Sequence, residues 1–487
     1  MSTVLTKAAP KTVGLFIDGK DTPSATGETF EVLNPTTNEL LATVAKATRE
    51  DVDRAVSAAK RALEGAWGKM KMAERAAILS KVAQRIIERA PELAELESAD
   101  VGKPLKESRV EMPRASLNFR FFAEMLTKMN SESAPVDSDF LNYHQRRPVG
   151  VAALITPWNF PFMLTTWKAG PCLAAGNTCV IKPASVAPLT PLLLGEICAE
   201  AGLPDGVLNV VSGAGPVVGT RLAEHPDVKL ISFTGETITG QTIMNTASKT
   251  LKRLSFELGG KSANIVFGDA TFEEAVAGSI RAIYANQGEV CLAGSRLVVE
   301  DSIYDRFVAE FIARARALKI GNPLEDTTDL GPLVSQEHLS RVKGYLDIAR
   351  NEGAHIVQGG HTPAGWERGN FLEPTVIVDV DNAMRCAQEE IFGPVVTITR
   401  FKGEDEAIRI ANDSRYGLAG VVWTNDLRKA HRVAQSVDAG TIWVNCWFVR
   451  DLRVPFGGMK ESGIGREGGH WSFDFYTEQK NICIKLN

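Results

Sequence analysis

Apolar residues in the first part of the chain recur at the spacing of amphipathic helices. Between residues 48 and 67, one helical face would carry Val52, Ala55, Val56, Ala59, Leu63 and Trp67. Thr48 followed three residues later by Asp51 is typical of a helix start, because side chains so spaced cap the free backbone N–H groups. The pattern predicts a helix over 48–67, and similar periodicity predicts helices over 72–100 and 105–128.

Beyond Val149 the period changes, and short β-branched runs alternate with helical stretches. Strands are predicted over 149–156, 178–182, 207–212, 229–234 and 262–267. Helices are predicted over 188–201, 215–223 and 240–247. This alternation favours an α/β fold with a doubly wound parallel sheet.

A second α/β lobe is predicted after residue 270. Its helices are expected over 271–290, 301–318 and 335–352, and its strands over 297–300, 372–379, 395–401 and 418–423. Residues 138–149 and 481–486 alternate weakly between apolar and polar positions. They are interpreted either as strands that pair with another subunit or as ordinary surface strands.

The composition is that of an ordinary globular protein, with 487 residues of which 44% are hydrophobic and 23% charged. The 54 Lys and Arg against 59 Asp and Glu give a net charge of −5, which argues against a nucleic-acid partner or an anionic-membrane surface. The most apolar stretch, 149–167, is broken by Pro157 and Pro161, so no membrane span is expected. Residues 1–10 lack the apolar core of a signal peptide.

The cysteines and histidines give no sign of a disulfide framework or a metal site. The seven cysteines are odd in number and include no Cys-x-x-Cys pair, and the seven histidines show no paired spacing typical of zinc ligands. A reduced, cytoplasmic location without a bound metal is therefore expected.

Cys291 and Glu257 are the first candidates for chemistry. Cys291 lies between a predicted helix and a predicted strand, and small neighbours such as Gly288 and Gly294 let a substrate approach its thiol. Taken alone, a buried inert cysteine is the commoner case.

Glu257 lies between two apolar residues, where desolvation would raise its pKa toward that of a general base, although an ordinary surface glutamate is the simpler interpretation. The Gly-Gly-Lys-Ser that follows is not a phosphate-binding loop, because Ser255 stands where that loop needs glycine.

Two further segments follow predicted strands. In the rigid, apolar turn 156–162, the amide of Asn159 is either a backbone clamp or an oxyanion donor. Residues 233–240 open a helix whose backbone N–H groups are suited to a pyrophosphate, although the glycine spacing alone is a weak signal.

Together these elements resemble the NAD(P)-dependent aldehyde dehydrogenase superfamily, over residues 14 to 487. The resemblance implies a Rossmann-like cofactor-binding domain over 1–127, 148–257 and 444–467, a catalytic α/β domain over 258–443, and a small β oligomerisation arm over 128–147 and 468–487. It implies that Cys291 is the nucleophile, Asn159 part of the oxyanion hole and Glu257 the base that activates water, while Lys168 and Glu467 form a proton relay. A homodimer or homotetramer is implied as well.

The resemblance also implies a nicotinamide cofactor site. Its residues would be Thr156, Pro157, Trp158, Lys182, Ser185, Phe233, Gly235, Glu236, Gly240, Gly259, Glu390 and Phe392. Lys182 and Glu390 match residues that hold the two riboses. Ser185 replaces a glutamate that NAD-preferring members usually carry, so NADP becomes acceptable beside NAD. Glu236 stands where many members have serine near the phosphates, and its carboxylate is expected to turn away from a pyrophosphate.

The substrate is predicted from the residues expected around the pocket. Arg114 and Arg450 suit a carboxylate, whereas Phe160, Trp167 and Phe456 would supply flat apolar walls. Arg453 is interpreted as either a further ligand or an ion-pair partner of Asp451. The tail from Trp447 is similar to that of the 2-hydroxymuconate and 2-aminomuconate 6-semialdehyde dehydrogenases, which implies a semialdehyde from aromatic ring cleavage.

Several alternatives stay open from the sequence. They are a general aromatic, aliphatic or betaine-type aldehyde dehydrogenase, a carboxymethyl-hydroxymuconate semialdehyde dehydrogenase, a CoA-acylating enzyme and a non-catalytic structural relative. Glu257 argues against the CoA-acylating enzyme, which usually lacks that base, and the arginines argue against a cationic substrate.

Overall fold

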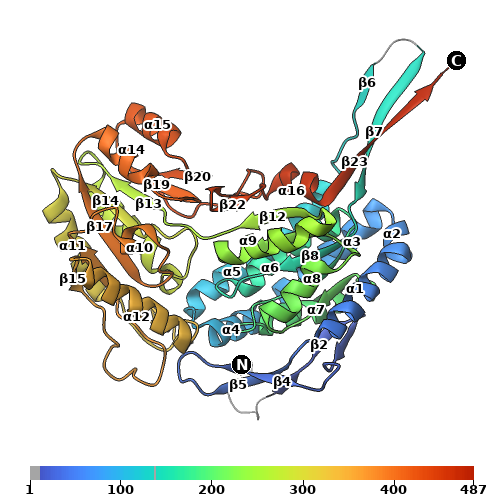
Figure 1. Cartoon of the computed structure of the whole chain (residues 1–487), viewed down its shortest axis with the longest axis horizontal. Coiled ribbons are helices and arrows are strands. Elements are labelled where there is room, and N and C mark those ends of the chain that lie inside the picture. The colour runs from blue at the N-terminus through green and yellow to red at the C-terminus, as the bar shows by residue number, and fades with distance from the viewer. Residues whose placement is uncertain (1–10, 136–138, 487) are drawn as a thin grey trace.

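The computed structural model describes residues 11–135 and 139–486, which form two α/β lobes and a projecting β arm (Figure 1). The N-terminal segment 1–10, position 138 of the predicted strand 138–149, and Asn487 lie outside the described residues. Within the described ranges, no helix combines the length and apolar character needed to cross a membrane.

The first lobe is built on an eight-stranded sheet. Five central strands run parallel, in the order β12 (Arg253–Glu257), β11 (Val228–Thr234), β8 (Val151–Ile155), β9 (Thr178–Lys182) and β10 (Leu208–Val210). The antiparallel edge strands are β22 (Gly463–Ile464) beside β12, then β2 (Leu15–Ile17) and β3 (Lys20–Thr22) beyond β10. Strands β9 and β11 lie on opposite sides of β8 in the sheet. The connections that follow β8 and β11 therefore run in opposite directions, and a crevice opens between the carboxyl ends of these two strands.

Helices connect and cover these strands. They are α1 (Arg49–Glu64), α2 (Ala66–Lys69), α3 (Met72–Glu88), α4 (Ala90–Val101), α5 (Leu105–Leu126), α6 (Pro161–Ala174), α7 (Leu189–Glu200), α8 (Thr220–Glu224) and α9 (Thr237–Ala247). The segment 72–100, predicted to be helical, is divided into α3 and α4, because the chain breaks at Arg89 and restarts with Pro91 in the first turn of α4. The segment 215–223 is only partly α-helical, since Gly215–Gly219 form a π-helical turn.

The second lobe carries a seven-stranded sheet. In order, its strands are β15 (His355–Gln358), β16 (Thr375–Val378), β17 (Val395–Phe401), β14 (Arg296–Glu300), β13 (Ala263–Val266), β19 (Ala419–Trp423) and β20 (Thr441–Val444). Its helices are α10 (Phe272–Tyr284), α11 (Tyr304–Ala317), α12 (Gln336–Asn351), α13 (Arg385–Gln388), α14 (Glu404–Asn412) and α15 (Leu427–Ser436). The strand expected over 262–267 therefore does not continue the first sheet. Residues 258–262 carry the chain from β12 across to β13 in the second lobe.

Smaller sheets complete the described structure. Strands β1 (Lys11–Val13), β5 (Leu40–Ala45) and β4 (Thr29–Leu33) form one, and β18 (Tyr416–Gly417) pairs with β21 (Met459–Lys460). The arm consists of β6 (Ser133–Pro135), β7 (Phe140–Pro148) and β23 (Thr477–Lys485), which follows α16 (Gly469–Tyr476). The two alternating segments noted in the sequence are thus partners in one antiparallel ladder, which projects from the first lobe (Figure 1).

Candidate active site

Two cavities meet at Cys291. The larger, of about 800 Å³, lies at the crevice beyond β8 and β11, and the smaller, of about 300 Å³, is lined by residues of α5 and α6 and of the loop that carries Arg450. Cys291 and Thr234 line both. Thr234 ends β11 of the first lobe, whereas Cys291 lies just before β14 of the second. Chemistry at this thiol therefore draws on groups from both lobes.

Most of the predicted cofactor residues line the larger cavity. They are Thr156, Pro157, Trp158, Lys182, Phe233, Gly235, Glu236, Gly259, Glu390 and Phe392. Ser185 and Gly240 lie outside its lining. The hydroxyl of Ser185 donates to the carbonyl of Gly213 at 2.8 Å. Gly240 faces Leu258, and a Cβ there would lie 2.9 Å from the leucine side chain, so this glycine lets α9 pack closely.

Lys182 and Glu390 give the larger cavity one group of each charge. The Lys182 ammonium donates to the Pro183 carbonyl at 2.9 Å, and burial lowers its pKa to about 8. Glu390 accepts from the Gly260 N–H at 2.9 Å, and burial raises its pKa to about 7. Within the described ranges neither group forms a salt bridge, so both can hydrogen-bond a ligand rich in hydroxyl groups. With the cavity volume, this pair fits the two riboses of a nicotinamide dinucleotide.

Glu236 lies directly before α9 and forms an ion pair with Arg341 of α12. Both side chains line the larger cavity, so the pair joins the two lobes across it. The Glu236 carboxylate is therefore paired with the Arg341 guanidinium, although it lies beside the first N–H groups of α9.

His338 belongs to an aromatic group in the same cavity. Its ring centroid lies 5.0 Å from that of Trp158, and the Trp158 centroid lies 5.2 Å from that of Phe392. The His338 Nε2 atom lies 2.6 Å from the Phe392 carbonyl oxygen. Burial lowers the pKa of His338 to about 4, so the ring is neutral and holds the Phe392 backbone.

Cys291 is a protonated thiol at neutral pH. Burial, followed by Glu390 and Glu257, raises its pKa to about 12, whereas Arg450 acts in the opposite direction. The Gly259–Gly260 turn packs against the Cys291 backbone, and a Cβ on Gly260 would lie 2.4 Å from the Cys291 carbonyl oxygen. The backbone that carries the thiol is thus closely packed, and the thiol needs a proton acceptor before it can react.

Asn159 lies just after β8 and is buried. Its side-chain Nδ2 donates to the Glu289 carbonyl at 2.8 Å, which uses one of the two N–H groups of the amide. Its own backbone carbonyl accepts from Asn286 Nδ2 at 3.0 Å. The two interpretations left open by the sequence are therefore compatible, since an amide clamped through one N–H can offer the other to an oxyanion.

Glu257 ends β12 and lines the smaller cavity with Cys291. The residue is 5% exposed, and neither carboxylate oxygen has a hydrogen-bond partner among the described residues. Burial, followed by the negative charge of Glu467, raises its pKa well above the ordinary value. An unpartnered carboxyl group of high pKa beside a thiol is suited to accept a proton.

Lys168 and Glu467 form a buried ion pair, and both charges act on the pKa of Glu257. Lys168 Nζ is 2.9 Å from Glu467 Oε1, and the Ser232 hydroxyl lies 2.9 Å from the ammonium and 3.1 Å from the same carboxylate oxygen. The Trp167 indole N–H donates to the other oxygen of Glu467. Since Glu467 and Trp167 line the smaller cavity, this polar chain reaches its wall.

The smaller cavity contains all the residues predicted to bind substrate. Its walls include Arg114, Phe160, Trp167, Arg450 and Phe456. The Arg450 guanidinium lies 3.5 Å from the ring centroid of Phe456 and 4.9 Å from that of Trp167.

The arginines of this cavity differ in their partners. No salt bridge with a described carboxylate engages Arg114 or Arg450, and Arg114 lies 5.3 Å from the Phe448 ring centroid. Arg453 instead binds Asp451, with Nη2 2.6 Å from Oδ2. Two cations that no described carboxylate engages in a salt bridge therefore line an apolar cavity beside Cys291.

Residues 22–482 match the Aldehyde dehydrogenase family. The chain is 48% identical to the 2-hydroxymuconic semialdehyde dehydrogenase of Pseudomonas sp. (strain CF600), over 98% of this chain and 100% of that relative. It is 47% identical to the 5-carboxymethyl-2-hydroxymuconate semialdehyde dehydrogenase of Escherichia coli, over 95% and 98% of the two chains. The chain belongs to the aldehyde dehydrogenase family.

This aldehyde dehydrogenase shares its fold with solved members of the family. An aldehyde dehydrogenase from Bacillus cereus, solved as an NAD⁺ complex, superposes with a TM-score of 0.96 at 41% identity and covers 98% of this chain and 97% of its own. The predicted fold class is confirmed, and the protein is an NAD(P)-dependent enzyme that oxidises aldehydes.

Sequence reasoning assigned no role in the site to several residues of this aldehyde dehydrogenase. They are Thr234, Asn286, His338, Arg341 and Phe448. His338 and Arg341 lie on α12, about 50 residues along the chain from Cys291, and no local pattern marks a helix that closes over a cavity of the other lobe. No group of three or more side chains suited to a metal ion was found among the residues described.

Proposed function

We propose that this aldehyde dehydrogenase oxidises a semialdehyde that carries a carboxylate, of the type produced by cleavage of an aromatic ring, to the dicarboxylic acid. The observation that carries the proposal is the presence of Arg114 and Arg450, neither in a salt bridge with a described carboxylate, in an apolar cavity beside Cys291. A guanidinium kept charged among aromatic rings attracts a carboxylate strongly, because water does not screen the pair. The relatives named for hydroxymuconic semialdehydes support the same substrate class.

In the proposed reaction, Cys291 loses its proton to Glu257 and its sulfur bonds to the aldehyde carbon. The resulting oxyanion is stabilised by the Asn159 amide and the Cys291 backbone N–H. NAD, when bound, would supply the acceptor for the hydride of that carbon, and Cys291 would then carry the acyl group as a thioester. Glu257 then removes a proton from water, whose oxygen attacks the thioester. The C–S bond breaks, the carboxylic acid is released, and the Cys291 thiolate regains a proton from Glu257. The Lys168–Glu467 pair would take the proton onward from Glu257.

Removal of the Arg450 side chain is expected to impair the acidic substrate selectively. We expect Arg450→Ala to lower kcat/KM for 2-hydroxymuconic semialdehyde by about 10–100-fold, since a lost charge-assisted hydrogen bond costs roughly 1.5–3 kcal/mol. For benzaldehyde, which has no carboxylate, the loss should stay within about threefold. Steady-state kinetics on both aldehydes measures the difference.

Arg453→Ala is the matched control, because Arg453 lines the same cavity but its charge is already paired with Asp451. It should leave the preference between the two aldehydes unchanged. Equal losses on both substrates in Arg450→Ala would contradict the assignment of Arg450 to the substrate carboxylate.

Two unpaired arginines also suit a substrate with two carboxylates, such as a carboxymethyl-hydroxymuconate semialdehyde. That second candidate follows from Arg114, which comes from α5 rather than from the loop that carries Arg450. A CoA-acylating enzyme and a non-catalytic relative are less favoured, because Glu257, Asn159 and Cys291 are present around one cavity system.

For the cofactor, Lys182 and Glu390 would hold the riboses, and the first turn of α9 would face the pyrophosphate. Trp158 and Phe392 would supply apolar contacts to the nicotinamide end. Ser185 bonds to the Gly213 carbonyl and brings no carboxylate to the cavity, so we propose that NADP is accepted beside NAD.

The Glu236–Arg341 ion pair is expected to govern cofactor affinity. Arg341→Ala would leave a bare carboxylate near the phosphate site, and we expect it to weaken NAD binding by about fivefold, roughly 1 kcal/mol of like-charge repulsion at an exposed position. The double variant Glu236→Ser with Arg341→Ala removes that carboxylate and should restore the affinity. The measurement is a fluorescence or calorimetric titration with NAD at low and high salt. An affinity that falls further in the double variant would show that Arg341 acts by another route.

We propose a homo-oligomer assembled through the arm. Strand β23 forms one edge of the arm sheet, and Phe140, Leu141, Ile484 and Leu486 are all 40% or more exposed there. Arg253 ties the arm to the first lobe by donating to the Thr477 carbonyl at 2.6 Å.

A cytoplasmic location is proposed because all seven cysteines are free.

A further inference from the structure

A strained turn precedes the nucleophile. Asn286, Gln287 and Gly288 all adopt left-handed conformations, with φ of 46°, 55° and 74°. Glycine adopts such values at low cost and asparagine does so occasionally, so Gln287 above all persists there only because its surroundings hold it. All three are buried, and the turn leads within a few residues to Cys291.

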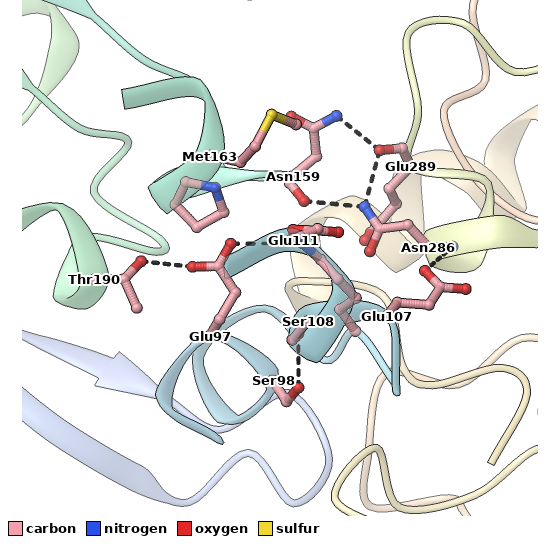
Figure 2. Close-up of polar contacts among 12 residues, drawn as sticks. Glu97, Ser98, Glu107, Ser108, Glu111, Asn159, Met163, Thr190, Asn286 and Glu289 are labelled. Carbon is pink, nitrogen blue, oxygen red and sulfur yellow. Dashed lines mark hydrogen bonds and ion pairs between the residues drawn. The ribbon is translucent and has the colours of Figure 1, made fainter. Parts of the chain in front are cut away.

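The side chain of Asn286 holds this turn against the Asn159 segment. Its Nδ2 donates to the Asn159 carbonyl at 3.0 Å and approaches the Glu289 carbonyl at 3.3 Å. The same Glu289 carbonyl accepts from Asn159 Nδ2 at 2.8 Å. Figure 2 shows the two amides facing each other with this oxygen between them. One asparagine thus fixes both the backbone of Asn159 and the oxygen that orients its side chain.

A glutamate from the first lobe fixes Asn286 in turn. Glu107 on α5 accepts from the Asn286 backbone N–H at 3.0 Å, and Figure 2 shows its carboxylate below the turn. Its helix is anchored by a buried ammonium, since Lys103 Nζ lies 2.5 Å from Glu111 and 3.5 Å from Glu97.

The same ammonium reaches toward the Asn159 segment. Lys103 Nζ lies 4.4 Å from the ring centroid of Phe160, the residue after Asn159. Groups on α5 and before it therefore support the Asn159 segment, and Lys103, Glu107 and Glu111 line neither cavity.

We propose that Asn286, held by Glu107, is a positioning residue that sets the direction of the Asn159 amide toward the oxyanion. Neither Asn286 nor Glu107 lines either cavity, so both act through Asn159 rather than on the substrate. The inference rests on the proposed role of Asn159. Contacts between the lobes, and not the turn 156–162 alone, therefore set the direction of the Asn159 amide.

The test compares a reaction that forms an oxyanion with one that does not. Asn286→Ala should lower kcat for aldehyde oxidation by about 10–100-fold, below the 10²–10³ typical of removing an oxyanion donor outright. Alkylation of Cys291 by iodoacetamide forms no oxyanion, and its rate should change by less than about threefold, as should the dissociation constant of NAD.

A double-mutant cycle with Asn159→Ala separates positioning from general damage. In the Asn159→Ala background, Asn286→Ala should have almost no further effect on kcat, because the amide that it aims is already gone. Glu107→Gln keeps an oxygen acceptor for the Asn286 N–H and should retain most activity, whereas Glu107→Ala should behave like Asn286→Ala.

The matched control is Asn209→Ala. Asn209 is also buried and also donates to two backbone carbonyls, those of Cys179 and Gly206, but it lies on β10 away from both cavities. It should lower the melting temperature without changing the ratio of oxidation rate to alkylation rate.

Three outcomes overturn the proposal: alkylation that falls in parallel with oxidation in Asn286→Ala, fully additive losses in the double variant, or wild-type kcat in a folded Asn286→Ala protein. If Asn159→Ala alone keeps full activity, the oxyanion role in the proposed function fails instead, and that result is distinguishable because it does not involve Asn286.

Discussion

Replacement of Cys291 by alanine is expected to abolish aldehyde oxidation, with kcat reduced by at least ~10⁴-fold, the order seen when a covalent nucleophile is deleted. The physical reason is that Cys291 is the one thiol that lines both cavities, so no neighbouring side chain can take its place at the aldehyde carbon. Binding of NAD should be preserved within about twofold, because Cys291 is only one of many residues that line the larger cavity. Production of NADH and a separate NAD titration measure the two quantities.

Cys446→Ala is the control for this experiment. Cys446 is a free, half-buried thiol on the loop that also carries Arg450, but it lies outside the lining of both cavities. It should keep wild-type activity, and iodoacetamide should inactivate it as fast as the wild type. Substantial turnover by Cys291→Ala, or loss of activity in Cys446→Ala alone, would contradict the assignment of the nucleophile.

The fold could be predicted from the sequence where an element has a strong period of its own. Strands such as 178–182 and 395–401 match β9 and β17 residue for residue, because each is rich in β-branched residues and mostly buried. The break at Arg89 escaped prediction, since the apolar period runs on through it and only Pro91 marks a new start. The sheet to which 262–267 belongs also could not be read from its own residues, because both sheets use the same kind of strand.

The candidate site was predictable where one motif carries the chemistry. Cys291, Glu257 and Asn159 each lie near or at the end of a strand within a recognisable segment. In the structure Cys291 lines both cavities, Glu257 lines the smaller one and Asn159 the larger one. Contacts across the lobes were not predictable. The bond from Asn286 to Asn159 and the ion pair from Arg341 to Glu236 join residues more than 100 positions apart, and their geometry exists only after the lobes have docked.

Replacement of Glu257 by glutamine is expected to lower kcat by about 10²–10⁴-fold, the contribution typical of a general base. A glutamine of nearly the same shape fits the site, since neither oxygen of Glu257 has a hydrogen-bond partner among the described residues. What it lacks is the ability to take a proton from water. Asp451→Asn is the matched control, because Asp451 also lines the smaller cavity but its charge is engaged by Arg453.

The pH dependence of kcat distinguishes this role from packing. Burial raises the pKa of the Glu257 carboxyl group well above its ordinary value, so at low pH the group is protonated and cannot act as a base. In the wild type, kcat should therefore rise with pH as Glu257 ionises and then level off. Glu257→Gln should lose this rise, whereas Asp451→Asn should keep it.

Hydroxylamine provides the final discrimination, because it attacks a thioester without needing a base. If Glu257 activates water for release of the acyl group, hydroxylamine should restore turnover of Glu257→Gln and yield a hydroxamate in place of the acid. The same addition should do nothing for Cys291→Ala, which forms no thioester. Failure of hydroxylamine to restore turnover would mean that Glu257 acts mainly before the thioester, as the acceptor of the Cys291 proton. The high pKa of that thiol, about 12, makes this earlier proton transfer the other step in which a base is needed.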